Sequence, residues 1–201
     1  VFCHANRTWH AMGVMLSCGG ALRWYRDTLG GGRNYNEITA SAATAPTGSE
    51  GLVFLPYLAG ERCPHNNPSA TGSFTGIHLG HSQAHFDRAV LEGITFGLLD
   101  GFRLLKGLGA SSSEVRVTGG GAGSDFWVQI IANAFEAPCV LLESDEGPAM
   151  GSAILAGVGT GVFSSVKEAT EKTIRTRKVV EPNESLSQNS YDKFRSLYHS
   201  L

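Results

Sequence analysis

Charged residues are scarce in this sequence, and neither sign of charge dominates. Lys and Arg number 16 against 18 Asp and Glu, and charged residues make up only 17% of the 201 positions. A chain so balanced has no basic footprint for nucleic acid or for an acidic membrane surface. Because 42% of its residues are hydrophobic, the chain is not intrinsically disordered. It suits one globular domain or part of a larger enzyme.

Paired cysteines and a signal segment are also missing. The four cysteines are scattered without a Cys-x-x-Cys pair, which favours reduced thiols in a cytoplasmic protein over disulfides or a zinc site. The chain starts at Val1 without a signal segment, so we expect it to be a piece of a longer protein. The uncharged stretch 147–166 contains five glycines. We expect a buried, tightly packed helix there rather than a membrane span.

Apolar periodicity divides the rest of the chain into alternating helices and short strands. We expect a loop at 40–49, and the alternation indicates an α/β fold. The pattern predicts helices over 8–29, 82–106, 124–136, 167–173 and 185–201, and strands over 52–55, 73–77, 114–118 and 138–142.

Glycine is the residue in excess, with 26 in the chain. Gly93, Gly97 and Gly101 fall on one face of the helix 82–106, where each costs about 1 kcal/mol relative to alanine. The compensation we expect is the close approach of another backbone to that face, which would make this helix central to the fold.

The glycines at 119–123 join a predicted strand to a predicted helix. Without Cβ atoms, the backbone amides of such a turn can face an anion or a planar ring, and Ser124 and Asp125 follow at capping positions. The run is not a P-loop, and Ser124 breaks the G-x-G-x-x-G pattern of dinucleotide sites. A plain strand-to-helix turn explains the same residues. A second helix start, at 147–152, could line the same ligand, although packing against the sheet explains it more simply.

Two other groups of residues are candidates for chemistry. His78, His81 and His85 match no zinc template with a fourth partner, so we interpret them as surface imidazoles. The tryptophans, at positions 9, 24 and 127, are expected in the core rather than in a stacking platform.

Several of these segments resemble the C-terminal domain of the FGGY family of carbohydrate kinases. Residues 72–77 followed by 85–92 resemble the family's C-terminal motif position by position: a glycine, an apolar–glycine–apolar step, a spacer and a helix that ends in an acid. Residues 55–68 are similar to the xylulokinase branch, and 119–125 resemble the family's adenine-nucleotide turn.

The resemblance implies a ribonuclease-H-like domain of the actin and hexokinase type, incomplete at its N-terminus. Residues 1–201 would be the C-terminal nucleotide-binding part of a two-domain sugar kinase, with 183–201 as a helical tail. The implied cofactor is ATP with Mg²⁺. Gly120, Gly121, Ala122 and Asp125 would lie near its adenosine and phosphates. Relatives often carry Asn where Asp125 stands, and a carboxylate there should prefer ribose hydroxyls or ring donors to phosphate oxygens.

The resemblance also implies what this chain lacks. The family's catalytic aspartate, its phosphate-binding hairpin and its sugar-binding domain would all precede Val1, so we assign no catalytic residue and no metal ligand. We expect an inactive piece of a kinase that phosphorylates a ketopentose, with D-xylulose 5-phosphate as the product. Gluconate, ribulose or glycerol kinases, a non-catalytic nucleotide-binding module and, remotely, a dinucleotide-dependent oxidoreductase stay open. A homodimer is compatible with the sequence.

Overall fold

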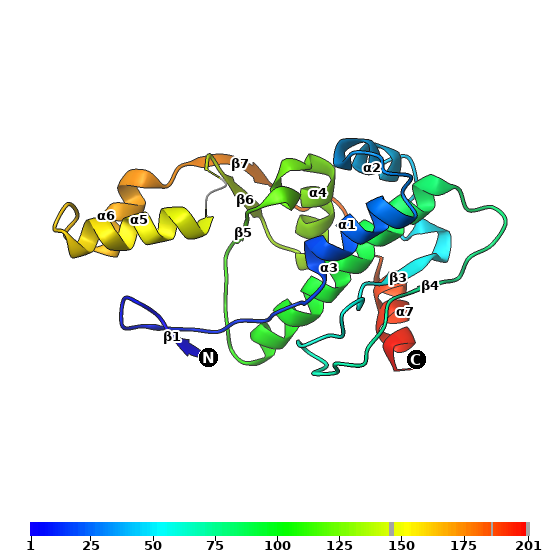
Figure 1. Ribbon diagram of the computed structural model, residues 1–201, viewed down its shortest axis with the longest axis horizontal. Coiled ribbons are helices and arrows are strands. Elements are labelled where there is room, and N and C mark those ends of the chain that lie inside the picture. The colour runs from blue at the N-terminus through cyan, green and yellow to red at the C-terminus, as the bar shows by residue number, and fades with distance from the viewer. Residues whose placement is uncertain (145–146, 186, 200–201) are drawn as a thin grey trace.

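The computed structural model describes residues 1–144, 147–185 and 187–199. Figure 1 shows a long central helix, α3, with most other elements gathered around it and a helical arm, α5 and α6, extending from one side. In the described ranges, no helix combines the length and apolar character needed to cross a bilayer. All four cysteines are free thiols.

Helix α3 (Gln83–Gly107) is the centre of the fold, as its glycine pattern predicts. Phe54 O lies only 2.2 Å from where a Cβ on Gly93 would stand, and Met15 covers Gly97 at 3.1 Å. A Cβ on Gly13 would lie 3.4 Å from the Cα of Gly101. The predicted backbone approach to this face is therefore confirmed. The elements packed around α3 are α1 (Cys18–Thr28), α2 (Tyr35–Ala42), β3 (Val53–Leu55), α4 (Asp125–Phe135) and α7 (Gln188–Tyr198).

A small mixed sheet lies beside α4. Strand β5 (Val115–Val117) pairs in parallel with β6 (Cys139–Leu142), and β6 pairs antiparallel with β7 (Thr176–Val180). Helix α4 makes the crossover that parallel neighbours require. Strands β3 and β4 (Ser73–Thr75) form a separate antiparallel pair, as do β1 (Phe2–Cys3) and β2 (Trp9–His10). The α/β class predicted from the sequence is confirmed.

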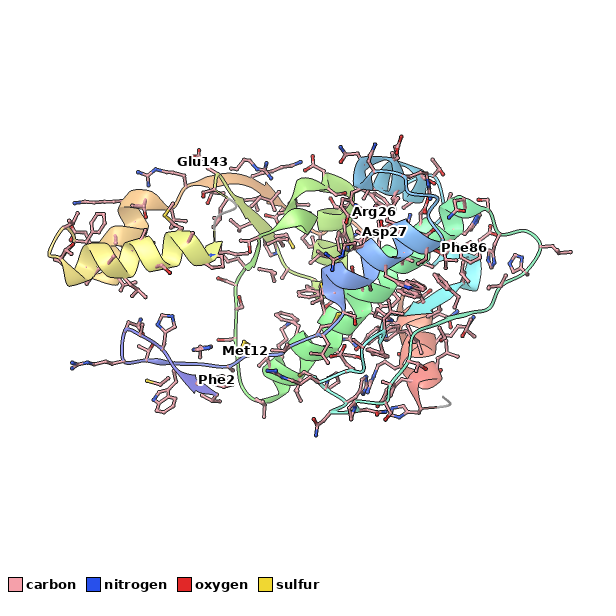
Figure 2. All side chains as sticks on the ribbon, in the orientation of Figure 1. Phe2, Met12, Arg26, Asp27, Phe86 and Glu143 are labelled. Atoms are coloured by element: carbon pink, nitrogen blue, oxygen red, sulfur yellow. The ribbon has the colours of Figure 1, made fainter. Side chains whose placement is uncertain are left out.

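The predicted helix over 8–29 is wrong in its first half, because α1 begins only at Cys18. The backbone of the preceding segment forms hydrogen bonds with residues distant in the sequence rather than within a helix. Leu16 N–H donates to Glu61 Oε1 at 3.1 Å, and Val14 O accepts from Cys63 N–H at 3.2 Å. The segment is therefore extended along α3. Trp9, expected in the core, is 71% exposed on the strand pair that projects from the body, where Figure 2 labels Phe2.

The expected loop at 40–49 is also partly wrong, because α2 runs through Ala42. Asn34 and Glu37 form a reciprocal capping box: Glu37 N–H donates to Asn34 Oδ1 at 3.0 Å, and Asn34 N–H donates to Glu37 Oε2 at 2.8 Å. Strand β7 was not predicted either. Only Val180 of its residues is buried, so it lacks the apolar alternation that marks a strand in sequence.

The uncharged segment forms α5 (Gly147–Gly159), but the expectation of a buried helix is wrong for this chain. Only Ile154 is buried, and Leu155 is 41% exposed. The helix extends from the body and packs chiefly on α6 (Val166–Thr173), which leaves most of its surface uncovered. At the other end of the chain, the helix predicted over 185–201 is found as α7, with Tyr191 and Phe194 buried against the core. Leu186, within the predicted range, lies outside the described residues.

Candidate nucleotide-binding site

The glycine run after β5 folds into one tight 3₁₀ turn, Gly120–Gly123, directly before α4. Gly119 has φ +79°, a value that favours glycine. Ser124 caps the helix, because its Oγ accepts from Trp127 N–H at 3.2 Å. Gly121 packs against the Trp127 ring, whose nearest atom lies only 3.2 Å from where a Cβ on Gly121 would stand. The turn is therefore rigid and has backbone on its surface.

Trp127 fixes this turn to the central helix. Its side chain is 5% exposed, and its indole N–H donates to Thr95 Oγ1 at 3.0 Å. Thr95 in turn donates to Leu91 O at 2.8 Å, one turn earlier in α3. Of the three tryptophans, Trp127 alone meets the expectation of a core residue, since Trp24 is 38% exposed and Trp9 more so. Its role is to hold the backbone of the turn in place.

The turn opens onto a cavity of about 380 Å³ between α1, α2, α3 and α4. Gly120 and Gly121 line it, together with Thr118 at the end of β5 and Tyr35 and Thr39 of α2. The other walls come from Cys18, Gly19, Leu22, Leu98, Val117, Ser124, Trp127 and Ile131. None of these lining residues carries a full charge, so hydroxyl groups, backbone and apolar surface make the walls.

Two of the four residues expected at the nucleotide do not line this cavity. Ala122 is 2% exposed and lies behind the turn, where its carbonyl accepts from Arg177 Nη2 at 3.3 Å. Asp125 lines a neighbouring groove of about 330 Å³, and its Oδ2 accepts from Lys178 Nζ at 2.8 Å. Cavity and groove share Thr39 and Ser124, so they adjoin. The structure thus brings Gly120 and Gly121 together and places Asp125 at the next hollow.

The second glycine-bearing helix start does not line the same cavity in the described chain. Gly147, Met150 and Gly151 border a hollow of about 360 Å³ between β6 and α6, with Arg116 and Arg175. Sequence reasoning missed the contribution of α2, which supplies Tyr35 and Thr39 to the cavity. The signal was present, because Asn34 and Glu37 have the spacing of a capping box.

Comparison with known proteins places this chain in a family. The family model for the FGGY family of carbohydrate kinases, C-terminal domain, matches residues 3–160. A xylulose kinase from Staphylococcus epidermidis is 40% identical over 194 residues, which cover 96% of this chain and 39% of that protein. A gluconokinase from Bacillus licheniformis is 33% identical, over 100% of this chain and 41% of its own length.

The solved structures agree with the sequence comparisons. A kinase from Brucella ovis, described as a xyloylose kinase, superposes with a TM-score of 0.84 at 34% identity, over 99% of this chain and 41% of that one. The fold is that of the actin- and hexokinase-like ATPases. The chain belongs to the FGGY family of carbohydrate kinases, within its C-terminal domain. It spans about two fifths of the length of the curated relatives that it matches.

Proposed function

We propose that the complete protein is a sugar kinase that transfers the γ-phosphoryl group of Mg²⁺-ATP to a ketopentose, and that residues 1–201 are its ATP-binding part. The observation that carries the proposal is the bare glycine turn, which faces an open cavity in a chain of a carbohydrate-kinase family. In this proposal residues 183–201 are the tail of this part, and α7 is the helix that the structure describes within it.

The walls of the cavity suit the neutral part of a nucleotide. Apolar side chains and the hydroxyls of Tyr35, Thr39 and Thr118 can enclose a base and its ribose. The backbone of Gly120 and Gly121 can approach the phosphates closely because no Cβ intervenes. Asp125, at the adjoining groove, would accept hydrogen bonds from ribose hydroxyls or ring donors. Ala122 would act from behind by fixing the turn.

Mg²⁺ does not fit this cavity by itself. It prefers oxygen ligands and is usually bound through carboxylates and substrate phosphates, but the described cavity walls contain no carboxylate. In this proposal the ion arrives with the nucleotide, and its protein ligands lie outside these walls. We likewise assign no catalytic base in this chain, so residues 1–201 alone should not catalyse the transfer.

Positioning is the contribution that this part of the enzyme would make. Phosphoryl transfer needs alignment and charge stabilisation more than covalent chemistry. A turn held by Trp127 and Arg177 offers backbone dipoles that need no reorganisation when the phosphates arrive. Closure against the sugar-binding part would exclude water and so limit hydrolysis of ATP.

D-Xylulose is the acceptor that we propose, with D-xylulose 5-phosphate as the product. The relatives named xylulose kinase, at up to 40% identity, support this choice over gluconate, although a gluconokinase is also similar. The sugar would bind through the other domain of the enzyme. We place the protein in the cytoplasm, in xylose metabolism, and a homodimer is compatible with this assignment.

The direct test uses the complete kinase polypeptide that contains this chain. ADP release would be measured with D-xylulose, gluconate, ribulose and glycerol, each with Mg²⁺-ATP. We expect the highest kcat/KM for D-xylulose. A higher value for another acceptor would identify that acceptor as the substrate in place of D-xylulose, and no turnover with any sugar or polyol would overturn the kinase assignment.

Two binding experiments address the alternatives. Thermal stabilisation by NAD but not by ATP would favour the oxidoreductase instead. Calorimetry of residues 1–201 with ATP separates a competent binding module from one that needs the rest of the enzyme.

A further inference from the structure

The loop between β4 and α3 brings a group of histidines against a distant turn of the chain. Gly76 has φ +91°, and a Cβ there would lie 2.5 Å from Gly51 O, so the start of the loop is packed directly on the turn Ser49–Gly51. The loop carries His78 and His81 and projects beyond α3, far from the β5–β7 sheet (Figure 1). Sequence spacing did not reveal Glu50 as a neighbour, because it precedes His78 by 28 residues and His81 by 31.

Three side chains converge at this contact. Glu50, His78 and His81 each offer one ligand atom, and these atoms all lie within 4.8 Å of one another. The rings of His78 and His81 face each other with centroids 3.7 Å apart. A third imidazole is close by, since His85 Nε2 lies 3.6 Å from Glu50 Oε2. Two imidazoles and a carboxylate form the kind of donor set that binds zinc.

Strained backbone presents the carboxylate. Residues 48–51 all have positive φ, and two of them, Ser49 at +47° and Glu50 at +51°, are not glycine. Such a conformation persists only where its surroundings impose it, and it is concentrated at functional sites. Here Gly48 N–H donates to Glu92 Oε1 at 3.0 Å, and Gly51 O accepts from Lys193 Nζ at 2.6 Å.

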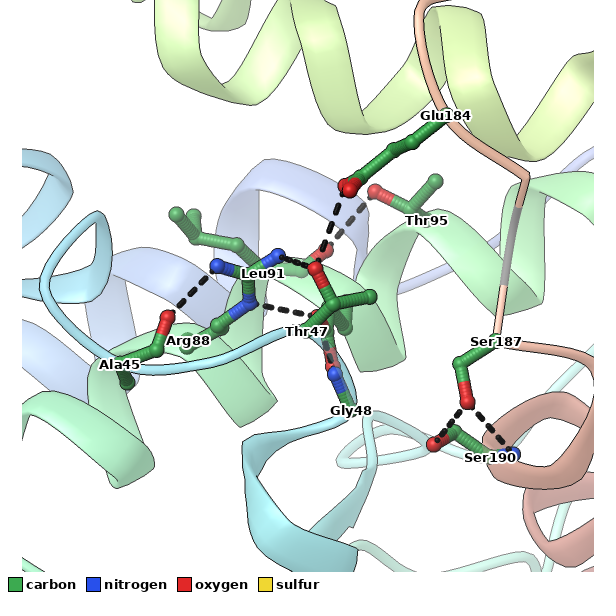
Figure 3. Close-up of polar contacts among 10 residues, drawn as sticks. Ala45, Thr47, Gly48, Arg88, Leu91, Thr95, Glu184, Ser187 and Ser190 are labelled. Carbon is green, nitrogen blue, oxygen red and sulfur yellow. Dashed lines mark hydrogen bonds and ion pairs between the residues drawn. The ribbon is translucent and has the colours of Figure 1, made fainter.

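A buried ion pair on α3 supports this turn (Figure 3). Arg88 Nε donates to Glu92 Oε1 at 2.7 Å, and its other nitrogens donate to Ala45 O and Thr47 Oγ1, both at 2.7 Å. Glu92 therefore accepts from Arg88 and from Gly48 together. The backbone that leads into Glu50 is therefore held from the core outward, and the exposed Glu50 side chain extends from this fixed turn.

His81 Nε2 is enclosed beside the Glu50 backbone but makes no hydrogen bond of normal geometry. Enclosed polar atoms are usually hydrogen-bonded, and a bound ion would account for the exception at this nitrogen.

We propose that Glu50, His78 and His81 bind a divalent transition-metal ion of the zinc class, with water or His85 as a fourth ligand. Zinc bonds of 2.0–2.2 Å in a tetrahedron place neighbouring donors about 3.4 Å apart. The three ligand atoms, which lie within 4.8 Å of one another, therefore need to close by up to about 1.4 Å around the ion, and both His78 and Glu50 are exposed side chains with room to move. The ion would tie the loop to the turn.

Binding must compete with hydrogen bonds that the rings already make. His81 Nδ1 accepts from His78 N–H at 3.2 Å, and His78 Nδ1 accepts from Gly80 N–H at 3.1 Å. A neutral ring that accepts at Nδ1 carries its proton on Nε2. An ion bound at either nitrogen therefore breaks one of these bonds or changes the tautomer, and both changes alter the ¹⁵N chemical shifts of the ring.

The test uses the complete kinase polypeptide, purified without an affinity tag. ZnCl₂ and MgCl₂ would be titrated by calorimetry and by thermal unfolding, and His ring nitrogens followed by NMR. We expect one zinc equivalent that raises the melting temperature and shifts the His78 and His81 resonances, with no such effect of Mg²⁺. Glu50→Gln, His78→Gln and His81→Gln should each weaken this binding by more than the roughly 10-fold that loss of an outer-shell partner costs.

His4→Gln is the matched control, because this exposed imidazole lies in the connection between β1 and β2, outside the cluster. It should leave the zinc equivalent intact. Equal zinc affinity in His81→Gln and the parent protein would overturn the proposal, as would loss of zinc binding in His4→Gln alone. Binding of Mg²⁺ that Glu50→Gln abolishes would overturn the assignment to a zinc-class ion. Unfolding of each ion-free variant at the parent's temperature confirms that the substitutions leave the fold intact.

Discussion

Gly93 and Phe54 are in such close contact that no side chain fits between them. The Phe54 carbonyl oxygen lies 2.2 Å from where a Cβ on Gly93 would stand, so β3 rests directly on the backbone of α3. This contact explains why a long helix carries glycine in its interior. The helix gives up about 1 kcal/mol of helix propensity and gains the close packing of a buried strand.

Gly93→Ala should therefore destabilise the protein, although alanine favours helix. The added methyl group must push β3 away from α3, and overpacking of this kind costs about 3 kcal/mol. Gly107→Ala, in the same helix, is the control. A Cβ there meets no atom within 4 Å, so stability should stay the same or rise by up to about 1 kcal/mol. Urea unfolding measures both, and equal stability of the two variants would contradict the packing argument.

Gly120→Val should weaken ATP binding without affecting the fold. A Cβ at Gly120 meets no atom within 4 Å, but the residue lines the cavity, so the larger side chain would occupy ligand space. We expect affinity to fall at least 10-fold, which corresponds to about 1.4 kcal/mol. Gly20→Val, on α1 beside the cavity-lining Gly19, is the matched control because it too has open space. Titration calorimetry measures the ATP affinity of both variants, and unchanged affinity in Gly120→Val would mean that the nucleotide binds elsewhere.

Asp125→Ala tests whether the carboxylate at the adjoining groove contacts the ribose. A hydrogen bond to a charged group contributes roughly 1.5–3 kcal/mol, so its loss should weaken ATP binding by about 10-fold or more. Lys178→Ala removes the present partner of Asp125 and should leave ATP affinity the same or higher. If Asp125→Ala binds ATP as tightly as the parent protein, Asp125 does not contact the ribose and its only role is the surface ion pair with Lys178.

Asp100 should make the free energy of unfolding fall as the pH rises, which is the opposite of the effect of an ion-paired surface acid. It is 8% exposed, and burial raises its pKa, while the Tyr191 hydroxyl and Arg195 act to lower it. A carboxyl with a raised pKa in the folded state stabilises the fold when protonated, and this contribution is lost as the pH rises through that pKa. Asp100→Asn cannot lose a proton, so its stability relative to the parent should rise from about pH 4 to pH 7.

Asp27→Asn supplies the opposite sign for comparison. Arg26 holds the pKa of Asp27 below its ordinary value through an exposed ion pair, so the parent gains stability there as the pH rises. Figure 2 shows both side chains on α1. Urea denaturation at stepped pH would measure the two differences. Parallel pH trends in the two variants would contradict the assigned role of burial at Asp100.

The local signals that the sequence contains were reliable where the structure needs only neighbours in the chain. The strand–glycine turn–helix at 115–135 and the N-cap at Ser124 were predicted because short-range hydrogen bonds and conformational preferences decide them. The glycine face of α3 also predicted a backbone contact, although not which backbone would make it. The capping box before α2 was present but not interpreted.

Amino-acid order by itself thus determined the α/β class, the family resemblance and the glycine turn, since each depends on residue types at fixed spacing. Only the tertiary structure decided that the segment before Cys18 is extended, because its backbone partners are Glu61 and Cys63. Only the tertiary structure showed that Asp125 pairs with Lys178 and that Glu50 lies beside His78 and His81. Contacts between residues far apart in the chain depend on how the elements pack around α3, and no local pattern records that packing.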